Sequence, residues 1–284
     1  MKLDSEAYVS ILQACMDTKS ISQGNQLHAH MVVNGVEQET SLKTKLLSFY
    51  VACGRMDDAR LLFNRMCHRN IFLWNEMIRG YAWNEPFEDA LALYYQMEQV
   101  GVHPNNFTYP FVLKACAGLS ALQEGRDIHY HVVKSGLEMD VYVASALIDM
   151  YAKCGDLENA RKMFDKIPKR DVVSWNALIA GYAHNGYAGE ALALYNQMQL
   201  ADVKPTSVTM VSVLPACAQL ATLQQGKLIH QTVIRYGFES HVSVGTALMD
   251  MYAKCGSVEI SRRMFDRMPQ RNSISWTAMI AGYS

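Results

Sequence analysis

The sequence carries little charge and no excess of either sign. Charged residues make up 19% of its 284 positions, against about 25% in an average soluble protein, while 50% are hydrophobic. This apolar content excludes intrinsic disorder, because it can supply a large core. The formal net charge is -1, so a nucleic-acid partner cannot be inferred from bulk charge. Any such binding must depend on where individual residues lie.

Long apolar runs and targeting signals are also missing. The longest uncharged stretch, between Lys204 and Lys227, is interrupted by Ser, Thr and Gln residues and by two prolines, so we expect no membrane contact. The first 17 residues contain three acidic side chains and neither a basic segment followed by an apolar run nor an Arg/Ser-rich amphipathic pattern. We therefore expect no targeting segment here. Seven cysteines without a CxxC pair are typical of a reducing compartment.

Catalytic motifs are absent from the sequence as well. It has no GxSxG motif, no P-loop, and no HxE motif combined with the PCxxC that a zinc deaminase needs. HxH pairs occur at His28 and His30 and at His129 and His131, but the third copy has Gln231 in place of its second histidine. No cysteine pair has zinc-finger spacing, so we interpret these histidines as packing residues. We expect no enzyme activity and no cofactor.

An internal period of 101 residues is the main signal of the sequence. Trp74, Trp175 and Trp276 lie in similar contexts, LWNEMIRGYA, SWNALIAGYA and SWTAMIAGYS. The same step relates the tyrosines, histidines and cysteines at Tyr50, Tyr151, Tyr252, His28, His129, His230, Cys15, Cys116, Cys217, Cys53, Cys154 and Cys255. Each block divides into units of 35, 35 and 31 residues, and a leader of residues 1–4 precedes them. A repeat protein is therefore predicted.

Each unit reads as two short helices. In 141–171, one apolar face precedes Gly155, a residue type that ends helices, and Asp156 is placed to cap a second helix that Pro168 stops. Such a hairpin cannot cover its own apolar face, so neighbouring hairpins must stack. The period predicts an all-α solenoid of either hand. Pro215 lies inside the first helix of 207–241 and is expected to kink or restart it.

The tryptophans share a face with Ile78, Ile179 and Ile280, so we place them in the core. The ninth unit holds only a first helix, and the chain reads as a fragment that we expect to aggregate when expressed alone. The residues expected to lack a covering second helix there are Trp276, Met279, Ile280 and Tyr283.

Three consecutive segments resemble the PLS subclass of plant pentatricopeptide repeat (PPR) proteins. They are VVSWNALIAGYAHNGYAGEALALYNQMQLADVKP, LPACAQLATLQQGKLIHQTVIRYGF and ALMDMYAKCGSVEISRRMFDRMP. Fixed triplets of P, L and S units are typical of that subclass. In its terms the units are L 5–39, S 40–70, P 71–105, L 106–140, S 141–171, P 172–206, L 207–241, S 242–272 and a truncated P 273–284.

The resemblance implies a right-handed α-solenoid superhelix that binds single-stranded RNA, with one base read by each unit. In the family, the fifth and last residues of a unit read the base, and the second residue lies between successive bases. The fifth residues are Thr44, Asn75, Pro110, Ser145, Asn176 and Thr246, and the last residues are Asn70, Asn105, Asp140, Asp171, Thr206 and Asn272. The apolar second residues are Phe72, Phe107, Tyr142, Val173 and Val208.

These pairs predict a preferred RNA. A fifth-residue Thr or Ser implies a purine and Asn a pyrimidine, while a last-residue Asp, which only accepts, favours bases with a ring N–H. The predicted core is 5'-A-Y-N-G-Y-N-A-3', with the G opposite Ser145 and Asp171. The L units have no readable pair, and Asn75 and Asn176 alone could simply cap their own helices.

The family also implies a role as a specificity factor in organellar C-to-U RNA editing or processing, in a mitochondrion or chloroplast. There the chemistry belongs to a C-terminal deaminase domain or to an editing factor supplied in trans. The alternative is a protein-binding scaffold of the tetratricopeptide type, whose units are a uniform 34 residues long.

Overall fold

The computed structural model describes residues 4–268, 271 and 273–283, which are helical with no strand among them. The chain divides into two compact halves, Met1–Leu137 and Glu138–Ser284. No helix in the described part is long and apolar enough to cross a membrane.

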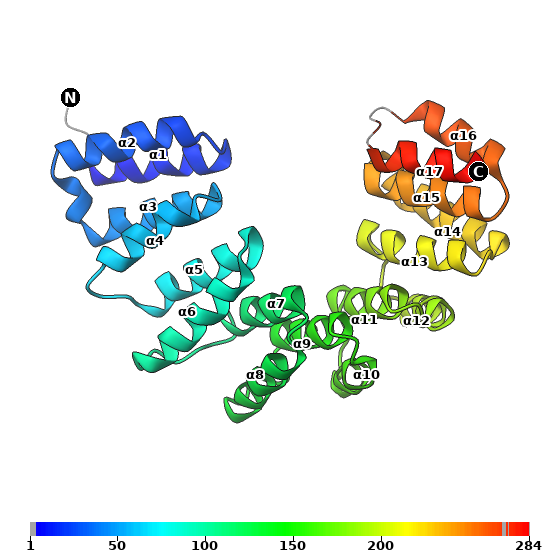
Figure 1. Ribbon diagram of the computed structural model, residues 1–284, viewed down its shortest axis with the longest axis horizontal. Helices are drawn as coiled ribbons and strands as arrows, with labels where there is room; N and C mark the ends of the chain where they lie inside the picture. The colour runs from blue at the N-terminus through cyan, green and yellow to red at the C-terminus, as the bar shows by residue number, and fades with distance from the viewer. Residues whose placement is uncertain (1–3, 269–270, 272, 284) are drawn as a thin grey trace. The chain divides into compact units, whose positions relative to one another are not determined.

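The N-terminal half contains four helix pairs and one short 3-10 turn (Figure 1). These elements are α1 Ser5–Asp17, α2 Ile21–Val33, η1 Val36–Gln38, α3 Thr40–Ala52, α4 Met56–Arg65, α5 Ile71–Asn84, α6 Phe87–Gln99, α7 Tyr109–Leu119 and α8 Leu122–Lys134.

The C-terminal half repeats the same pairing and finishes with a single helix. Its elements are α9 Val141–Lys153, α10 Leu157–Lys166, α11 Val172–His184, α12 Ala188–Leu200, α13 Ser207–Gln219, α14 Leu223–Tyr236, η2 Phe238–Ser240, α15 Val242–Lys254, α16 Val258–Arg267 and α17 Ser273–Tyr283.

Within each half, the first helices of successive units pack side by side. The contacts run α1 to α3 to α5 to α7 in one half and α9 to α11 to α13 to α15 to α17 in the other. Each second helix packs on the first helix of its own unit, and α4, α6, α10, α12, α14 and α16 also pack on the first helix of the next unit. The result is an α-solenoid of helical hairpins, as the period predicts. Within each half the first helices form one layer, which carries the fifth residues and the second residues except Phe107, in the turn before α7.

The hairpin of α9 and α10 shows how the sequence sets these elements. Gly155 has φ +80°, a backbone conformation that glycine adopts without a steric penalty, and it ends the turn after α9. The carboxylate of Asp156 accepts the backbone N–H of Asn159 at 3.2 Å and so caps α10, as predicted. Leu147, Ile148 and the other members of the predicted apolar face point into the core.

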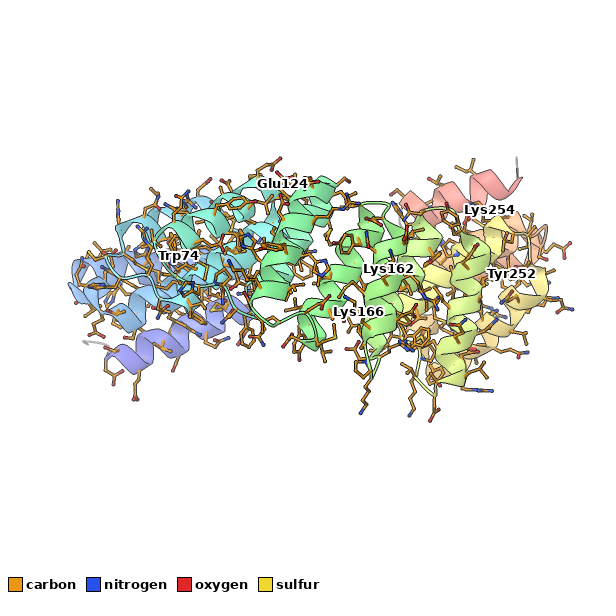
Figure 2. All side chains as sticks on the ribbon, turned by 90° about the horizontal axis from the view of Figure 1, so that it is seen from below. Trp74, Glu124, Lys162, Lys166, Tyr252 and Lys254 are labelled. Carbon is orange, nitrogen blue, oxygen red and sulfur yellow. The ribbon has the colours of Figure 1, made fainter. Side chains whose placement is uncertain are left out.

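A repeated aromatic joint links each S unit to the following unit. Trp74, which Figure 2 labels within the helices, is fully buried and meets Phe63 edge-on at 4.8 Å between ring centroids. Arg69 lies over the same Phe63 ring, and its Nε donates to the Phe63 carbonyl at 2.9 Å. The guanidinium thereby adds a second donor to a carbonyl at the end of α4 that also accepts the backbone N–H of Met66 at 3.2 Å. The joint recurs one period later in Phe164, Arg170 and Trp175.

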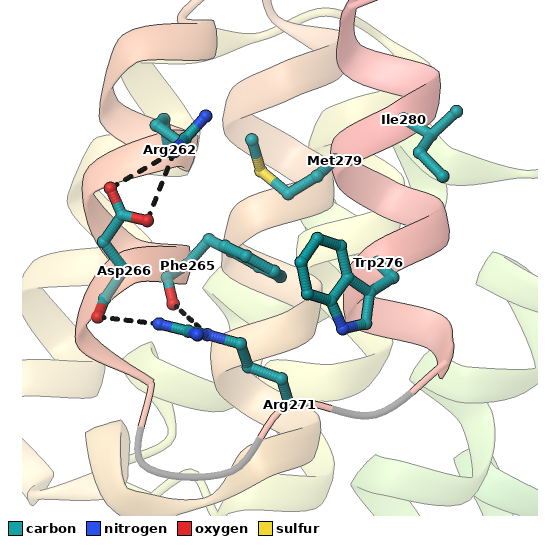
Figure 3. A pocket seen from close by; sticks show the side chains of 7 residues that line it. All are labelled: Arg262, Phe265, Asp266, Arg271, Trp276, Met279 and Ile280. Carbon is teal, nitrogen blue, oxygen red and sulfur yellow. Dashed lines mark hydrogen bonds and ion pairs between the residues drawn. The ribbon is translucent and has the colours of Figure 1, made fainter.

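The third copy of this joint is open on one side. Figure 3 shows Arg271 against Phe265 and Asp266, beside Trp276, in a pocket of about 560 Å³. Trp276 is 52% exposed, which agrees with the expectation that it lacks a covering second helix and contradicts its predicted place in the core, whereas Trp74 and Trp175 are buried. The difference is that α6 and α12 pack on the helices of those two residues, whereas no second helix of its own unit packs on α17 among the described residues.

Two further expectations at the C-terminal half need correction. Met279 was expected to lack cover but is buried against Met249 and Phe265, while Ile280 is exposed as expected. Pro215 does not restart its helix, because α13 runs unbroken from Ser207 to Gln219. Because proline has no backbone N–H, Pro215 leaves the carbonyl of Val211, one turn earlier, without its helical partner. Both residues lie on the exposed side of α13, where water can hydrate that carbonyl.

Candidate nucleic-acid interface

The fifth and last residues of the first P unit meet in one side-chain cluster. The Asn75 amide Nδ2 donates to Asn105 Oδ1 at 3.2 Å, across 30 residues of sequence. The hydroxyl of Thr108, the third residue of the next unit, donates to Asn75 Oδ1 at 2.7 Å. The Asn105 backbone N–H in turn donates to Thr108 Oγ1 at 3.0 Å. We call Asn75, Asn105 and Thr108 the first cluster.

The second P unit repeats this arrangement one period later. Asn176 Nδ2 donates to Thr206 Oγ1 at 3.2 Å, and the Thr209 hydroxyl donates to Asn176 Oδ1 at 2.6 Å. The Thr206 backbone N–H donates to Thr209 Oγ1 at 2.9 Å. Asn176, Thr206 and Thr209 form the second cluster. In both clusters the Asn amide bonds to other side chains and does not cap its own helix, so the simple capping interpretation of Asn75 and Asn176 is wrong.

The fifth residues of the S units turn their hydroxyls toward the protein. Thr44 Oγ1 donates to the Thr40 carbonyl and Thr246 Oγ1 to the Val242 carbonyl, both at 2.8 Å and both one helical turn back. Ser145 is 5% exposed, and its buried hydroxyl has no hydrogen-bond partner. The hydroxyl protons of Thr44 and Thr246 are therefore already used within their own helices, which leaves these two hydroxyls only as acceptors.

The last residues of several units cap the helix of the following unit. Asn70 Oδ1 accepts the Leu73 N–H at 3.1 Å, and Asp171 Oδ1 accepts the Ser174 N–H at 2.9 Å. Asp140 likewise caps α9. A cap by itself explains the preference for Asn and Asp at these positions. Asn272 lies outside the described residues.

The remaining predicted residues fall into two groups. Pro110 is half-buried in the first turn of α7, in the N-terminal half, whereas its partner Asp140 belongs to the C-terminal half. The second residues are all on the surface, with exposed fractions from 49% to 72%, at Phe72, Phe107, Val173, Val208 and Tyr142.

The histidines of the repeat bond to tyrosine hydroxyls on neighbouring helices. His28 bonds Tyr50 at 2.8 Å, and His230 bonds Tyr252 at 2.9 Å. Burial lowers the pKa of His230, although Glu239 opposes this, and burial with help from Asp58 raises the pKa of Tyr50 to about 12. These contacts support the packing interpretation. Among the described residues, no three His, Cys, Asp or Glu side chains gather as a metal site would require.

Sequence reasoning did not single out Thr108 and Thr209. Both are fully buried, and both lie 33 residues after the fifth-position Asn that they contact. A hydroxyl recurring at the period, on the third position of the units that follow P units, was the available signal. The family resemblance names only the second, fifth and last residues of a unit, so this third position lies outside the predicted site.

The comparisons with known proteins agree with the repeat geometry. The PPR repeat family model matches residues 69–118 and 170–219, and the PPR repeat model matches 44–71, 142–172 and 246–273. The chain is 41% identical over 284 residues to the chloroplastic pentatricopeptide repeat-containing protein CRR2 of Arabidopsis thaliana, covering 98% of this chain and 43% of the relative. A mitochondrial pentatricopeptide repeat-containing protein of the same plant is 39% identical over 277 residues, covering 98% and 44%. The chain therefore spans less than half the length of these two relatives.

Solved structures share the fold. Pentatricopeptide repeat protein PPR10 in complex with an 18-nt psaJ RNA element superposes with a TM-score of 0.75 at 17% identity, covering 99% of this chain and 43% of that one. PPR10 from maize gives a TM-score of 0.66 at 20% identity, covering 98% and 42%.

Proposed function

Because the chain belongs to the pentatricopeptide repeat family, we propose that it binds single-stranded RNA sequence-specifically, with one base read by each unit. The observation that supports this most is the hydrogen bonding of fifth to last residue in both P units. Two residues 30 positions apart in sequence thereby form one polar group beside exposed apolar second residues. Stacking on such residues contributes roughly 1–3 kcal/mol per base.

The cap bonds sharpen the proposed base preferences. Asn105 Oδ1 accepts the backbone N–H groups of Phe107 and Thr108. The amide of Asn105 therefore offers a base its N–H donors. Such donors match the ring acceptor N3 of cytosine and not the N3–H of uracil. Asn70 presents donors for the same reason, which suits the ring acceptor N1 of adenine. Asp171 keeps its second oxygen as an acceptor for the ring N–H of guanine. These preferences support the core 5'-A-C-N-G-Y-N-A-3', a narrower form of the sequence-based prediction.

We further propose that the chain belongs to the PLS subclass and acts as a specificity factor in organellar RNA editing or processing. The order of 35- and 31-residue units supports the subclass. The chloroplastic and mitochondrial relatives support an organellar location. In an editing role the deaminase would come from a further domain or from a partner in trans. The right-handed sense of the superhelix also stays a prediction.

Gel-shift titration of the purified chain tests the binding proposal. RNA with the predicted core should bind more tightly than a scrambled RNA, and its affinity should fall as salt rises, since phosphate contacts release counterions. Replacing the G opposite Ser145 and Asp171 should be among the costliest substitutions. Indifference to RNA sequence, or binding of peptides and not of RNA, would overturn the proposal and favour a protein-binding scaffold of the tetratricopeptide type.

A further inference from the structure

We propose that Thr108 and Thr209 are positioning residues that fix the amide orientation of Asn75 and Asn176 and so set the pyrimidine preference of the two P units. The inference rests on the proposed RNA binding. It assigns a role to the third residue of the unit after each P unit, a position outside the predicted reading set.

The hydroxyl geometry dictates the orientation. A backbone N–H can only donate, so Thr209 Oγ1 must accept the N–H of Thr206. The hydroxyl proton is then free to go to its nearest acceptor, Asn176 Oδ1, at 2.6 Å. Thr209 has 0% exposure, so water does not compete for this proton. The carbonyl side of the Asn176 amide is thereby anchored, and its Nδ2 is directed to Thr206 and to the open side.

The first cluster is held more firmly. Asn105 Oδ1 accepts the backbone N–H groups of Phe107 and Thr108, so the Asn105 amide is itself fixed. Turning the Asn75 amide around would bring its oxygen against Asn105 Oδ1, and two acceptors would face each other. Asn105 and Thr108 therefore both orient the Asn75 amide, although the Thr108 proton has Asn105 Oδ1 as a second acceptor at 3.1 Å. The Thr206 hydroxyl can rotate to donate or accept, so Asn176 depends on Thr209 alone.

The fixed orientation has a chemical consequence for the base. One N–H of the Asn amide remains as a donor after the bond to the last residue is made. On the Watson–Crick edge, cytosine and uracil share the acceptor O2, where adenine has C–H and guanine has an amino donor. Where it faces that position of the edge, a fixed donor therefore suits both pyrimidines and neither purine, although adenine N1 and guanine O6 are acceptors elsewhere on the same edge. An amide free to turn would lose this distinction.

The S unit 141–171 provides a matched contrast. Ser174, the third residue of the following unit, is also buried, but its hydroxyl donates to the Asp171 carbonyl at 2.9 Å and not to the fifth residue Ser145. A buried hydroxyl at this position is thus compatible with the fold without orienting a reading residue. The variant Ser174→Ala removes a comparable local bond and serves as the control.

The RNA experiment measures affinity for four RNAs that differ only at the nucleotide opposite Asn176. Removing one fixed hydrogen bond should lower the pyrimidine-to-purine affinity ratio of Thr209→Val by about three- to tenfold. Thr209→Ser, which keeps the hydroxyl, should retain the ratio. Ser174→Ala should leave it unchanged, and Thr108→Val should change the ratio at its own nucleotide less than Thr209→Val does. An unchanged ratio in Thr209→Val that still binds RNA would overturn the inference and leave the proposed RNA binding intact.

A measurement on the protein without RNA tests the anchoring of the Asn176 amide separately from the proposed RNA binding. In the free, 15N-labelled chain, the side-chain amide protons of Asn176 should exchange slowly with water, and in Thr209→Val they should exchange several-fold faster. Thermal unfolding of each variant establishes that it folds, and Thr209→Ala, which also lacks the hydroxyl, replaces Thr209→Val if that variant does not fold. Unchanged exchange would overturn the anchoring. Failure of the wild-type chain to bind any single-stranded RNA, with the exchange result as expected, would remove the proposed function and the base preference but not the anchored amide.

Discussion

The P units and the S units present their fifth residues in opposite ways. In the P units, Asn75 and Asn176 are half-buried amides bonded to side chains of the next unit. In the S units, Thr44 and Thr246 bond to carbonyls of their own helices, and the Ser145 hydroxyl is buried. The Thr44 and Thr246 hydroxyls can donate to a base only after they release a backbone carbonyl, whereas a P-unit amide keeps an N–H donor at a polar junction. Under the proposed function, the fifth residues of the P units should therefore contribute more to specificity than those of the S units, and the preference for G at the unit 141–171 should depend mainly on Asp171.

The largest expected effect comes from removing the P-unit amides. The double variant Asn75→Ala/Asn176→Ala should weaken binding of the predicted RNA at least about thirtyfold, because each of two well-placed contacts to a base contributes roughly 1–3 kcal/mol. The S-unit counterpart Ser145→Ala/Thr246→Ala should weaken it less than about threefold in the same gel-shift assay. Equal losses in the two double variants would remove the contrast between P and S units.

A smaller effect is expected at the surface residues that flank the two P units. Phe72 and Phe107 flank Asn75 in sequence, whereas Val173 and Val208 flank Asn176. Phe107→Ala should cost about 1 kcal/mol of RNA-binding free energy, the low end for base stacking, since Phe72 remains. Val208→Ala, measured by the same titration, should cost less than half as much. A larger loss in Val208→Ala would show that the second residue does not act by stacking.

The third effect concerns stability and needs no RNA. Ser145→Ala removes a buried hydroxyl without a partner, so the free energy of unfolding should rise by up to about 1 kcal/mol. Asn176→Ala leaves the Thr209 hydroxyl without its acceptor and should lower it by about 1 kcal/mol. Urea unfolding followed by circular dichroism measures both. A destabilised Ser145→Ala would mean that the hydroxyl has a partner in solution.

The smallest expected effect is a change of stability with pH, which arises at a contact of the S unit 242–272 and not at the P units. Burial lowers the pKa of His230, which bonds Tyr252 of that S unit, below the ordinary value of 6.5. As pH falls through 6.5, the unfolded chain therefore takes up a proton before the folded chain does, and stability decreases. The fall should be below about 1 kcal/mol by pH 5.5 and should be shallower in His230→Gln. Parallel pH profiles of unfolding for the two proteins would contradict this.

Much of the fold follows from the period. The 101-residue step, the glycine and Asp156 between α9 and α10, and the shared face of Trp74 and Trp175 all predict features that the structure contains. These features depend on local backbone preferences and on burial of apolar side chains, both of which a repeated pattern exposes. Trp276 departs from the pattern because its exposure depends on which helix follows it.

The site could be predicted only in part. The pattern identifies Asn75 with Asn105 and Asn176 with Thr206 as pairs, because family resemblance names the positions. It does not predict that Ser145 is buried, since that depends on how far a small side chain reaches from its helix. Nor does it predict whether each amide offers its oxygen or its N–H groups, because this depends on hydrogen bonds to residues of the next unit.

The use of a unit's last residue as the cap of the next helix limits how the repeat can be recoded. Asn, Asp, Ser and Thr all cap helices well, and they also cover the donor and acceptor patterns that distinguish bases. Exchanging one for another can alter the proposed nucleotide preference at little cost to folding, whereas an aliphatic residue would lose both properties. Asn70, Asp140 and Asp171 are thus positions at which an engineered array could acquire a new target without redesign of its scaffold.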